Sequence, residues 1–201
     1  MFDAHLLPYL HRMLGPPAGA LARRGITADQ VTLAGFGIGG LALPALWAGL
    51  FLPALLLILV NRLADGLDGA LARLHGPTDR GAFLDIALDF LFYALVPLGF
   101  VLADPAVNAV AGAVLIASFI GTGSSFLAFA IIAERRGLMS SDFPKKGLYY
   151  LGGLTEGTET IAFFVLICLF PSYFPVLALI FAAACFVTTG LRWSQGWHAF
   201  S

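Results

Sequence analysis

The sequence predicts an all-α integral membrane protein with six transmembrane helices and an N-terminal amphipathic helix at the membrane interface. The first observation is composition, because 59% of the 201 residues are hydrophobic and only 11% are charged, whereas soluble proteins average about 25% charged residues. The second is a series of apolar runs near the length of roughly 20 residues that spans a bilayer. The third is the placement of Lys and Arg in alternate loops between these runs.

The N-terminal segment, residues 1–24, differs from the runs that follow it. Apolar residues recur there at helical spacing, with polar residues between them, and the apolar members are Phe2, Leu6, Leu10, Met13 and Leu14. This pattern predicts a short amphipathic helix that lies on the inner membrane surface. Residues 31–193 are then expected to form the six-helix bundle, so that the whole chain, 1–201, is a single membrane domain.

Five apolar runs are long enough to be spans by themselves: about 31–51, 81–103, 106–133, 147–170 and 173–193. A sixth run, about 53–73, opens with ALLLILV and then becomes polar. We count it as a span because the segments on either side of it need a return crossing.

The basic residues predict the orientation, since Lys and Arg favour the cytoplasmic side. With the N-terminus inside and six alternating helices, the three outer loops contain no Lys or Arg. Ten of the 11 basic residues then lie inside or at inner helix ends: Arg12, Arg23, Arg24, Arg73, Arg80, Arg135, Arg136, Lys145, Lys146 and Arg192. The other, Arg62, lies in the inner half of the second span.

Other features exclude several function classes. The net charge of −1 and the lack of a basic block indicate no nucleic-acid partner. The two cysteines, Cys168 and Cys185, lie within apolar runs and are expected to be packing residues rather than a disulfide or a metal pair.

Four aspartates fall on the inner halves of the second and third spans, where charge is unfavourable and usually functional or paired. Helical periodicity places Asp65 and Asp68 on one face of the second span and aligns Asp85 with Asp89 on the third. The short link at 74–80 allows an antiparallel hairpin. The four carboxylates are therefore expected to converge.

Converging carboxylates repel each other unless cations intervene. Oxygen ligands suit Mg²⁺, Mn²⁺ or Ca²⁺, and this set could hold two ions around a pyrophosphate. Gly69 and Gly81 would let a ligand approach the two helices closely. The alternative is that the aspartates pair with Arg62, Arg73 and Arg80 to join helices, and four carboxylates with interleaved glycines favour the metal interpretation over it.

Residues 65–89 read DGLDGALARLHGPTDRGAFLDIALD. This stretch resembles the signature of the CDP-alcohol phosphotransferases, D-x2-D-G-x2-A-R followed after a gap by G-x3-D-x3-D. All the signature residues are present: Asp65, Asp68, Gly69, Ala72, Arg73, Gly81, Asp85 and Asp89. The gap between Arg73 and Gly81 is shorter than the family commonly has.

The resemblance implies an enzyme that moves a phosphatidyl or other phosphoalcohol group from a cytidine diphosphate (CDP) carrier to an acceptor hydroxyl, with release of CMP. By analogy, the donor is a CDP-linked lipid, CDP-diacylglycerol. The family also has six transmembrane helices, an interfacial N-terminal helix and a site that opens to the cytoplasm, which implies the inner, cytoplasmic membrane. We further expect a homodimer, with small residues of the fourth span, Gly112, Gly121 and Gly123, permitting close helix approach.

The same resemblance implies the roles of the site residues. Two Mg²⁺ or Mn²⁺ ions would be held by Asp65, Asp68, Asp85 and Asp89, with Asp89 also acting as the general base. Gly69, Arg73 and Thr78 would contact the nucleotide, and the segment from Asp29 to Thr32 would close over it. A threonine in Thr78's place before a helix is also a common N-cap.

The acceptor is a small or lipid alcohol that the motif does not identify. A phosphorylated acceptor needs cations, and the candidates are Arg135, Arg136, Lys145, Lys146 and Arg192, which inside-positive topology also explains. Glu156 and Glu159 could instead hold the ammonium group of serine, ethanolamine or choline, or hydrogen-bond to neighbouring helices. We predict an amino alcohol or zwitterionic acceptor.

Two rival functions use the same residues. A divalent-cation transporter or channel also needs intramembrane acids, but its path requires polar residues through the full bilayer depth, and the outer halves of the spans are almost wholly apolar. An inactive membrane scaffold is disfavoured because no signature position is lost.

Overall fold

The computed structural model of the chain describes residues 3–137 and 153–201, and side chains from Met13 onward within them. These residues are mostly helical, and no strand occurs among them. The helices are α1 (Asp3–Arg23), α2 (Ala28–Gly40), α3 (Ala42–Trp47), α4 (Phe51–His75), α5 (Asp79–Ala103), α6 (Pro105–Arg135), α7 (Gly157–Leu169) and α8 (Phe174–Ala199), with a 3-10 turn at Pro171–Tyr173.

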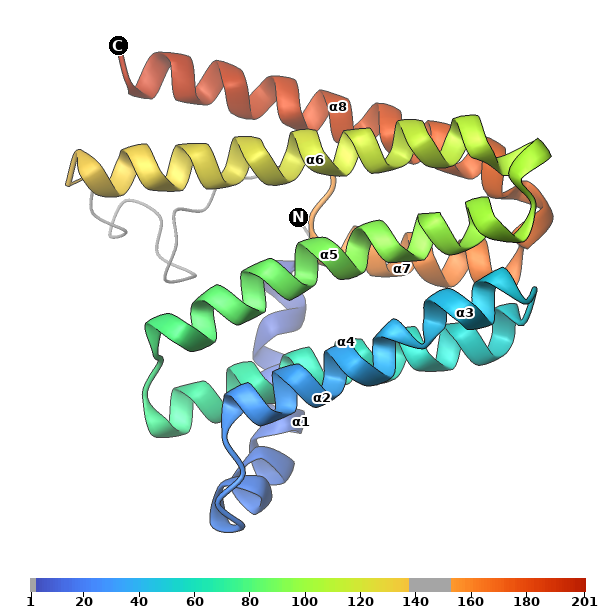
Figure 1. The fold of residues 1–201 in the computed structure, drawn as a ribbon. Coiled ribbons are helices and arrows are strands. Elements are labelled where there is room, and N and C mark those ends of the chain that lie inside the picture. Colours follow the sequence, from blue (N-terminus) through green and yellow to red (C-terminus); the bar gives the residue numbers. More distant parts are fainter. Residues whose placement is uncertain (1–2, 138–152) are drawn as a thin grey trace.

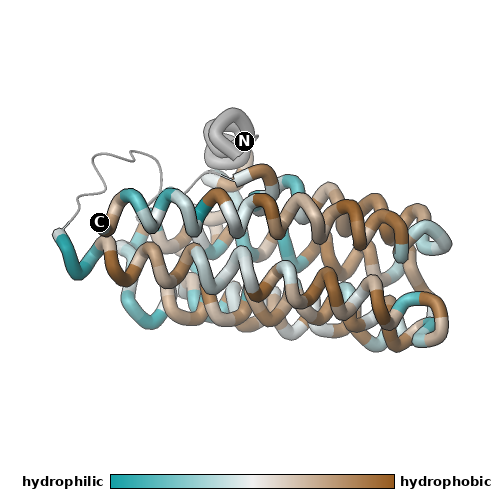
Figure 2. The backbone as a smooth tube through the Cα atoms, turned by 90° about the horizontal axis from the view of Figure 1, so that it is seen from above, coloured by the Kyte–Doolittle hydropathy of each residue, from teal (hydrophilic) through white to brown (hydrophobic). Residues whose placement is uncertain are grey.

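The helices form a bundle in which α6 lies beside α8, α2 lies beside α4, and α5 runs between these two pairs (Figure 1). Helix α1 runs at a steep angle to the bundle and packs on α4. Hydrophobic segments cover most of the bundle's length (Figure 2). This arrangement confirms the predicted all-α membrane fold.

Four stretches of the described chain are long and apolar enough to cross a membrane: 28–47, 79–103, 105–135 and 171–199. Helix α4 has 25 residues, but from its middle onward it carries Arg62, Asp65 and Asp68, which lower its hydropathy. Helix α7 has 13 residues, and the first part of the predicted span 147–170 lies outside the described residues. The count of six spans therefore stays a prediction.

The predicted first span, 31–51, is not one continuous helix. Helix α2 ends at Gly40 and α3 begins at Ala42. Pro44 explains the break, because a proline nitrogen has no hydrogen to donate to the carbonyl four residues earlier, which here belongs to Gly40. The last helix is longer than predicted, since α8 continues to Ala199 and the predicted span ends at residue 193.

Polar caps begin the two helices that open towards the site. Thr27 caps α2 in a capping box with Gln30, and Thr78 Oγ1 accepts a hydrogen bond from the backbone N–H of Gly81 at 3.1 Å. Such caps satisfy N–H groups that a helix leaves unpaired at its first turn. Both helix starts are thereby held in place beside the α4–α5 connection.

The main hydrophobic core joins α3 to α8 and is rich in stacked aromatic rings. Phe100 stacks on Phe174 with ring centroids 4.6 Å apart, and Phe163 stacks on Phe181 at 4.3 Å. A smaller cluster of Leu14, Ala18, Ala70 and Leu71 holds α1 against α4. The aspartates lie outside both clusters.

Two glycines let α2 approach α4 at very short range. A Cβ atom on Gly35 would overlap the Cβ of Ala64, and one on Gly39 would lie 2.6 Å from the Cβ of Asn61. The backbone carbonyl of Gly35 also accepts a hydrogen bond from Asn61 Nδ2 at 3.1 Å. This contact brings the start of α2 to the acidic face of α4.

The small residues of α6 pack inside the chain. Side chains added at Gly112, Gly121 and Gly123 would meet Val101, Thr189 and Phe90, respectively. Their close approach therefore serves neighbouring helices of the same chain. The homodimer itself stays a prediction.

The α2–α4 contact makes a stability prediction with a control on the same helix. Gly35→Ala should lower the apparent Tm in detergent by several degrees, because overpacking costs about 1–3 kcal/mol. Gly37→Ala should leave Tm unchanged or raise it slightly, since a Cβ there meets nothing within 4 Å and Ala is the better helix former. Equal Tm values for both variants, measured by thermal unfolding, would contradict the described contact.

Candidate functional site

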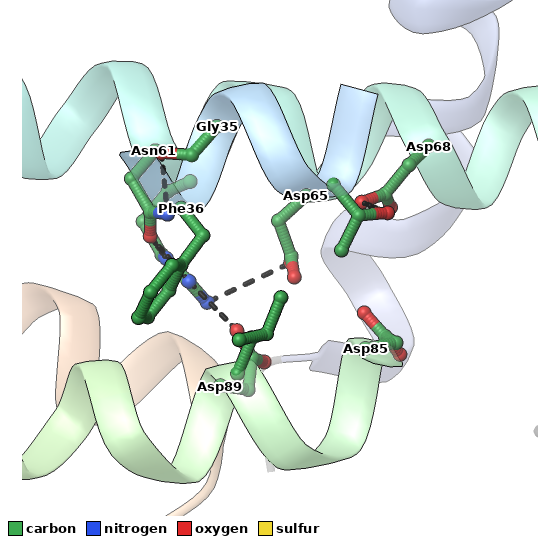
Figure 3. Close-up of a pocket in the computed structure, with 10 residues that line it drawn as sticks. Gly35, Phe36, Asn61, Asp65, Asp68, Asp85 and Asp89 are labelled. Atoms are coloured by element: carbon green, nitrogen blue, oxygen red, sulfur yellow. Dashed lines mark hydrogen bonds and ion pairs between the residues drawn. The ribbon is translucent and has the colours of Figure 1, made fainter. Parts of the chain in front are cut away.

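The four signature aspartates extend from α4 and α5 into one space between these helices (Figure 3). Asp65 and Asp68 come from α4, and Asp85 and Asp89 come from α5. The helices face each other there because only residues 76–78 separate them. The structure therefore brings all four carboxylates to one cavity wall.

Three of these carboxylates form a group that fits a metal ion. One oxygen from each of Asp65, Asp68 and Asp85 lies within 4.8 Å of the other two. Ca²⁺–oxygen distances of about 2.3–2.6 Å span such separations, and the shorter Mg²⁺–oxygen distances of about 2.0–2.1 Å would draw the oxygens closer together by about 0.6 Å. Asp68 is buried, Asp65 is partly buried and Asp85 is exposed, so the group is open on one side to a substrate.

Asp89 is held differently. Its Oδ1 lies 2.7 Å from Nη2 of Arg62, while Nη1 of Arg62 lies 3.7 Å from Oδ2 of Asp65. The ion-pair alternative considered from the sequence therefore holds for Arg62, which pairs mainly with Asp89. Arg80 instead pairs with Asp29, with Nη2 and Oδ2 at 2.5 Å.

The guanidinium of Arg62 is surrounded by partners. Asn61 Oδ1 accepts hydrogen bonds from its Nη2 and, at 2.9 Å, from its Nε, and Tyr93 Oη accepts from its Nη1 at 3.3 Å. The rings of Phe92 and Tyr93 lie 4.9 and 5.3 Å from its central carbon. Only 8% of the side chain is exposed. These contacts fix the guanidinium beside Asp89.

A cavity of about 510 Å³ opens next to the aspartates. It lies between the starts of α2 and α5 and the last turns of α4. Its volume falls within the range of roughly 300–1,000 Å³ that is usual for small-molecule sites. The predicted substrate residues on its wall are Asp29, Thr32, Gly69 and Thr78, together with all four aspartates.

Two predicted substrate residues, Thr32 and Thr78, have local roles that the structure shows. Thr32 Oγ1 donates a hydrogen bond to Asp68 Oδ2 at 2.6 Å, so it orients a carboxylate of the metal group. Thr78 caps α5, as the alternative interpretation expected. Arg73 is exposed and is not among the described residues that line the cavity. A Cβ on Gly69 would lie 3.5 Å from Nη1 of Arg73, which places this guanidinium beside the wall.

The structure adds residues that the motif did not identify. Asn61 and Arg62 join the site through Asp89, and Arg80 reaches across the cavity to Asp29, which is 51 residues away in sequence. The sequence does contain one indication that Arg62 is paired, since a charge in an apolar span usually has a partner. Nothing in the local sequence indicates the pairing of Arg80 with Asp29.

The two predicted acceptor glutamates do not line this cavity. Glu156 and Glu159 form a capping box at the start of α7, where Oε2 of Glu159 accepts from the N–H of Glu156 at 3.1 Å. Neither glutamate is among the described residues that line the two cavities beside the aspartates. Lys145 and Lys146 lie outside the described residues. The acceptor role of these four residues stays a prediction.

Three comparisons place the chain among known proteins. Two crystal structures of the phosphatidylinositol phosphate synthase of Mycobacterium tuberculosis share its fold at 23% identity. The one with CDP-DAG bound has a TM-score of 0.72 and covers 92% of this chain and 94% of that one. The one in complex with manganese and citrate has a TM-score of 0.71 and covers 92% of this chain and 88% of that one.

Sequence comparison gives the family. The inner membrane protein YnjF of Escherichia coli (strain K12) is 57% identical over 195 residues, which cover 96% of this chain and 95% of that protein. The CDP-alcohol phosphatidyltransferase family model matches residues 26–191, a range that contains α2 to α6 and all four aspartates. The chain therefore belongs to the CDP-alcohol phosphatidyltransferase family.

Proposed function

We propose that the chain, as one catalytic domain, transfers a phosphatidyl group from CDP-diacylglycerol to an acceptor hydroxyl and releases CMP. The observation that carries this proposal is the group of Asp65, Asp68 and Asp85, whose oxygens lie within 4.8 Å of one another on the wall of a cavity of about 510 Å³. Two similar proteins support this proposal. The M. tuberculosis structural neighbour has CDP-DAG bound, and the E. coli relative is an inner membrane protein. With the inside-positive loops, they support a site on the cytoplasmic side of the inner membrane.

The donor nucleotide would occupy the cavity between α2 and α5. Gly69 on its wall lets the diphosphate approach α4, and Arg73 beside it suits bidentate phosphate binding. A side chain at Gly81 would crowd Thr78 Oγ1 at 3.1 Å and Asp29 Oδ1 at 3.2 Å. The absence of that side chain keeps the two polar groups close to each other and to the nucleotide.

Asp65, Asp68 and Asp85 would hold one Mg²⁺ or Mn²⁺ ion, and Asp89 would contribute to a second. The neighbour in complex with manganese supports this assignment, as does the all-oxygen donor set. The bound ions would neutralise charge on the diphosphate and on the leaving CMP. Thr32 keeps Asp68 in its orientation through the 2.6 Å hydrogen bond.

In the transfer step, the acceptor oxygen attacks the β-phosphorus of the donor while a carboxylate oxygen of Asp89 takes the hydroxyl proton. The bond between the β-phosphorus and the bridging oxygen breaks, and the electron pair leaves with CMP. Oδ1 of Asp89 accepts a hydrogen bond from Nη2 of Arg62. Oδ2 makes no hydrogen bond to the described part of the chain, which leaves this oxygen for the proton.

The same geometry argues against the transporter alternative. A cation path must continue beyond the aspartates through the bundle. Next to them the described chain holds Phe36 and Leu88, and beyond these lies the core with the fully buried Phe92, Val96 and Phe100. The cavity is thus closed towards the bundle's interior, as suits an enzyme site.

Activity should depend on a divalent cation. Purified protein should release CMP from CDP-diacylglycerol with Mg²⁺ or Mn²⁺ and an acceptor, and should lose this activity in excess EDTA, because unscreened carboxylates repel the diphosphate. Restoring Mn²⁺ should restore the rate. Full activity in excess EDTA would rule out the metal assignment.

Two substitutions should separate the base from the metal ligands. Asp89→Asn should lower kcat by about 10²–10⁴-fold, the usual contribution of a general base, and leave CDP-diacylglycerol binding within a few-fold. Asp68→Asn should raise the Mg²⁺ concentration needed for half-maximal rate. Asp79→Asn, an exposed position outside the cavity wall, is the matched control and should behave as wild type. Near-normal turnover of Asp89→Asn would show that the base is another group.

We expect the acceptor to be an amino alcohol. The alternative is a phosphorylated polyol, which the similarity to a phosphatidylinositol phosphate synthase supports. Glu156→Gln and Glu159→Gln should each raise KM for an amino alcohol by about tenfold or more, because a hydrogen bond to a charged group contributes about 1.5–3 kcal/mol. The glutamine carbonyl still caps α7, so stability should hold. Glu134→Gln, an exposed change on α6, is the control. Turnover of inositol phosphate or glycerol 3-phosphate alone would contradict the hypothesis.

A further inference from the structure

We propose that Arg62 is a resident cation that keeps the second metal ion away from Asp89 until the donor's diphosphate is bound. The proposal rests on the proposed function and deepens it, because it orders the binding of ions and donor. Arg62 lies outside the residues of the family signature, and it acts here as a positioning residue rather than as a group that touches substrate.

The guanidinium of Arg62 is held in a fixed position. Its Nη2 lies 2.7 Å from Asp89 Oδ1, and Asn61 and Tyr93 accept its remaining described hydrogen bonds. Asn61 is itself buried and anchored to the carbonyl of Gly35 on α2. An arginine held directly by residues of α4 and α5, and through Asn61 by α2, does not swing aside readily. A cation that approaches Asp89 therefore meets a fixed positive charge.

The local charge also opposes the binding of a second ion. Four carboxylates and the guanidinium of Arg62 carry a formal net charge of −3. One divalent ion on Asp65, Asp68 and Asp85 brings this charge to −1, and a second ion would make the site positive. Like charges at short range in a partly buried site repel strongly. The second ion therefore binds weakly to the protein alone.

The donor changes this balance. The diphosphate of a CDP-alcohol carries two negative charges, so its arrival returns the site with two ions to a net negative charge. The second ion is then stabilised jointly by the diphosphate and by the carboxylate of Asp89. Without Arg62, the four carboxylates alone would accept two ions with no net positive charge, and the dependence on the donor would be lost.

Mn²⁺ binding to the purified protein tests the proposal without an activity measurement. Free Mn²⁺ is followed by its electron paramagnetic resonance signal during titration, with and without CDP, after correction for Mn²⁺ that CDP binds by itself. Wild type should bind one ion per chain tightly without CDP and two with CDP. Arg62→Gln should bind two without CDP, with the Kd of the second ion at least tenfold lower than in wild type.

Two variants control for charge and for general effects. Arg62→Lys keeps the positive charge and should bind one ion tightly without CDP. Arg24→Gln removes an exposed arginine outside the cavity wall and should leave the number of ions unchanged. A melting curve establishes that each variant is folded, and the wild-type comparison with and without CDP does not depend on any variant.

The outcomes separate the two proposals. Two equally tight ions in wild type without CDP, or an unchanged isotherm in folded Arg62→Gln, would overturn the role of Arg62 and leave the proposed function standing. Failure of wild type to bind any Mn²⁺, with or without CDP, would contradict the metal site and with it the proposed function.

Discussion

The structure depends on one constraint: four carboxylates that lie inside an apolar helix bundle must be balanced by positive charge. Charged groups are unfavourable at this depth unless they are paired or solvated. Arg62 balances part of the charge through Asp89, and the oxygens of Asp65, Asp68 and Asp85 are close enough together to share one ion. The exposed Asp85 and the cavity beside it leave the remaining charge accessible to water. These three arrangements let a chain with few charged residues keep an acidic centre.

The packing around the centre follows from this constraint. Gly35 and Gly39 let α2 touch α4, and that contact places Thr32 against Asp68 and the Gly35 carbonyl against Asn61. The same helix therefore orients a carboxylate of the metal group and, through Asn61, the guanidinium that holds Asp89. The aromatic core on the other side makes α5 a rigid support for Asp85 and Asp89.

Sequence reasoning predicted the fold class and the convergence of the aspartates, because both follow from local periodicity. The spacing of Asp65, Asp68, Asp85 and Asp89 along two adjacent helices determines which face each carboxylate occupies. The pairing of Arg80 with Asp29 and the anchoring of Arg62 depend on which helices become neighbours, and no short motif encodes that. The capping role of Glu156 was also missed, since a cap depends on where a helix starts, and α7 starts at Gly157, within the predicted span. The break before Ala42 was predictable from Pro44 but was hidden by the continuous apolar run.

The central claim is that the carboxylates of α4 and α5 form a metal centre. Crystals grown with Mn²⁺, measured at a wavelength where manganese scatters anomalously, would locate bound ions directly. The account predicts an anomalous difference peak in contact with carboxylate oxygens of Asp65, Asp68 and Asp85. A map at saturating Mn²⁺ with no peak between α4 and α5, or with peaks only elsewhere on the protein, would contradict it.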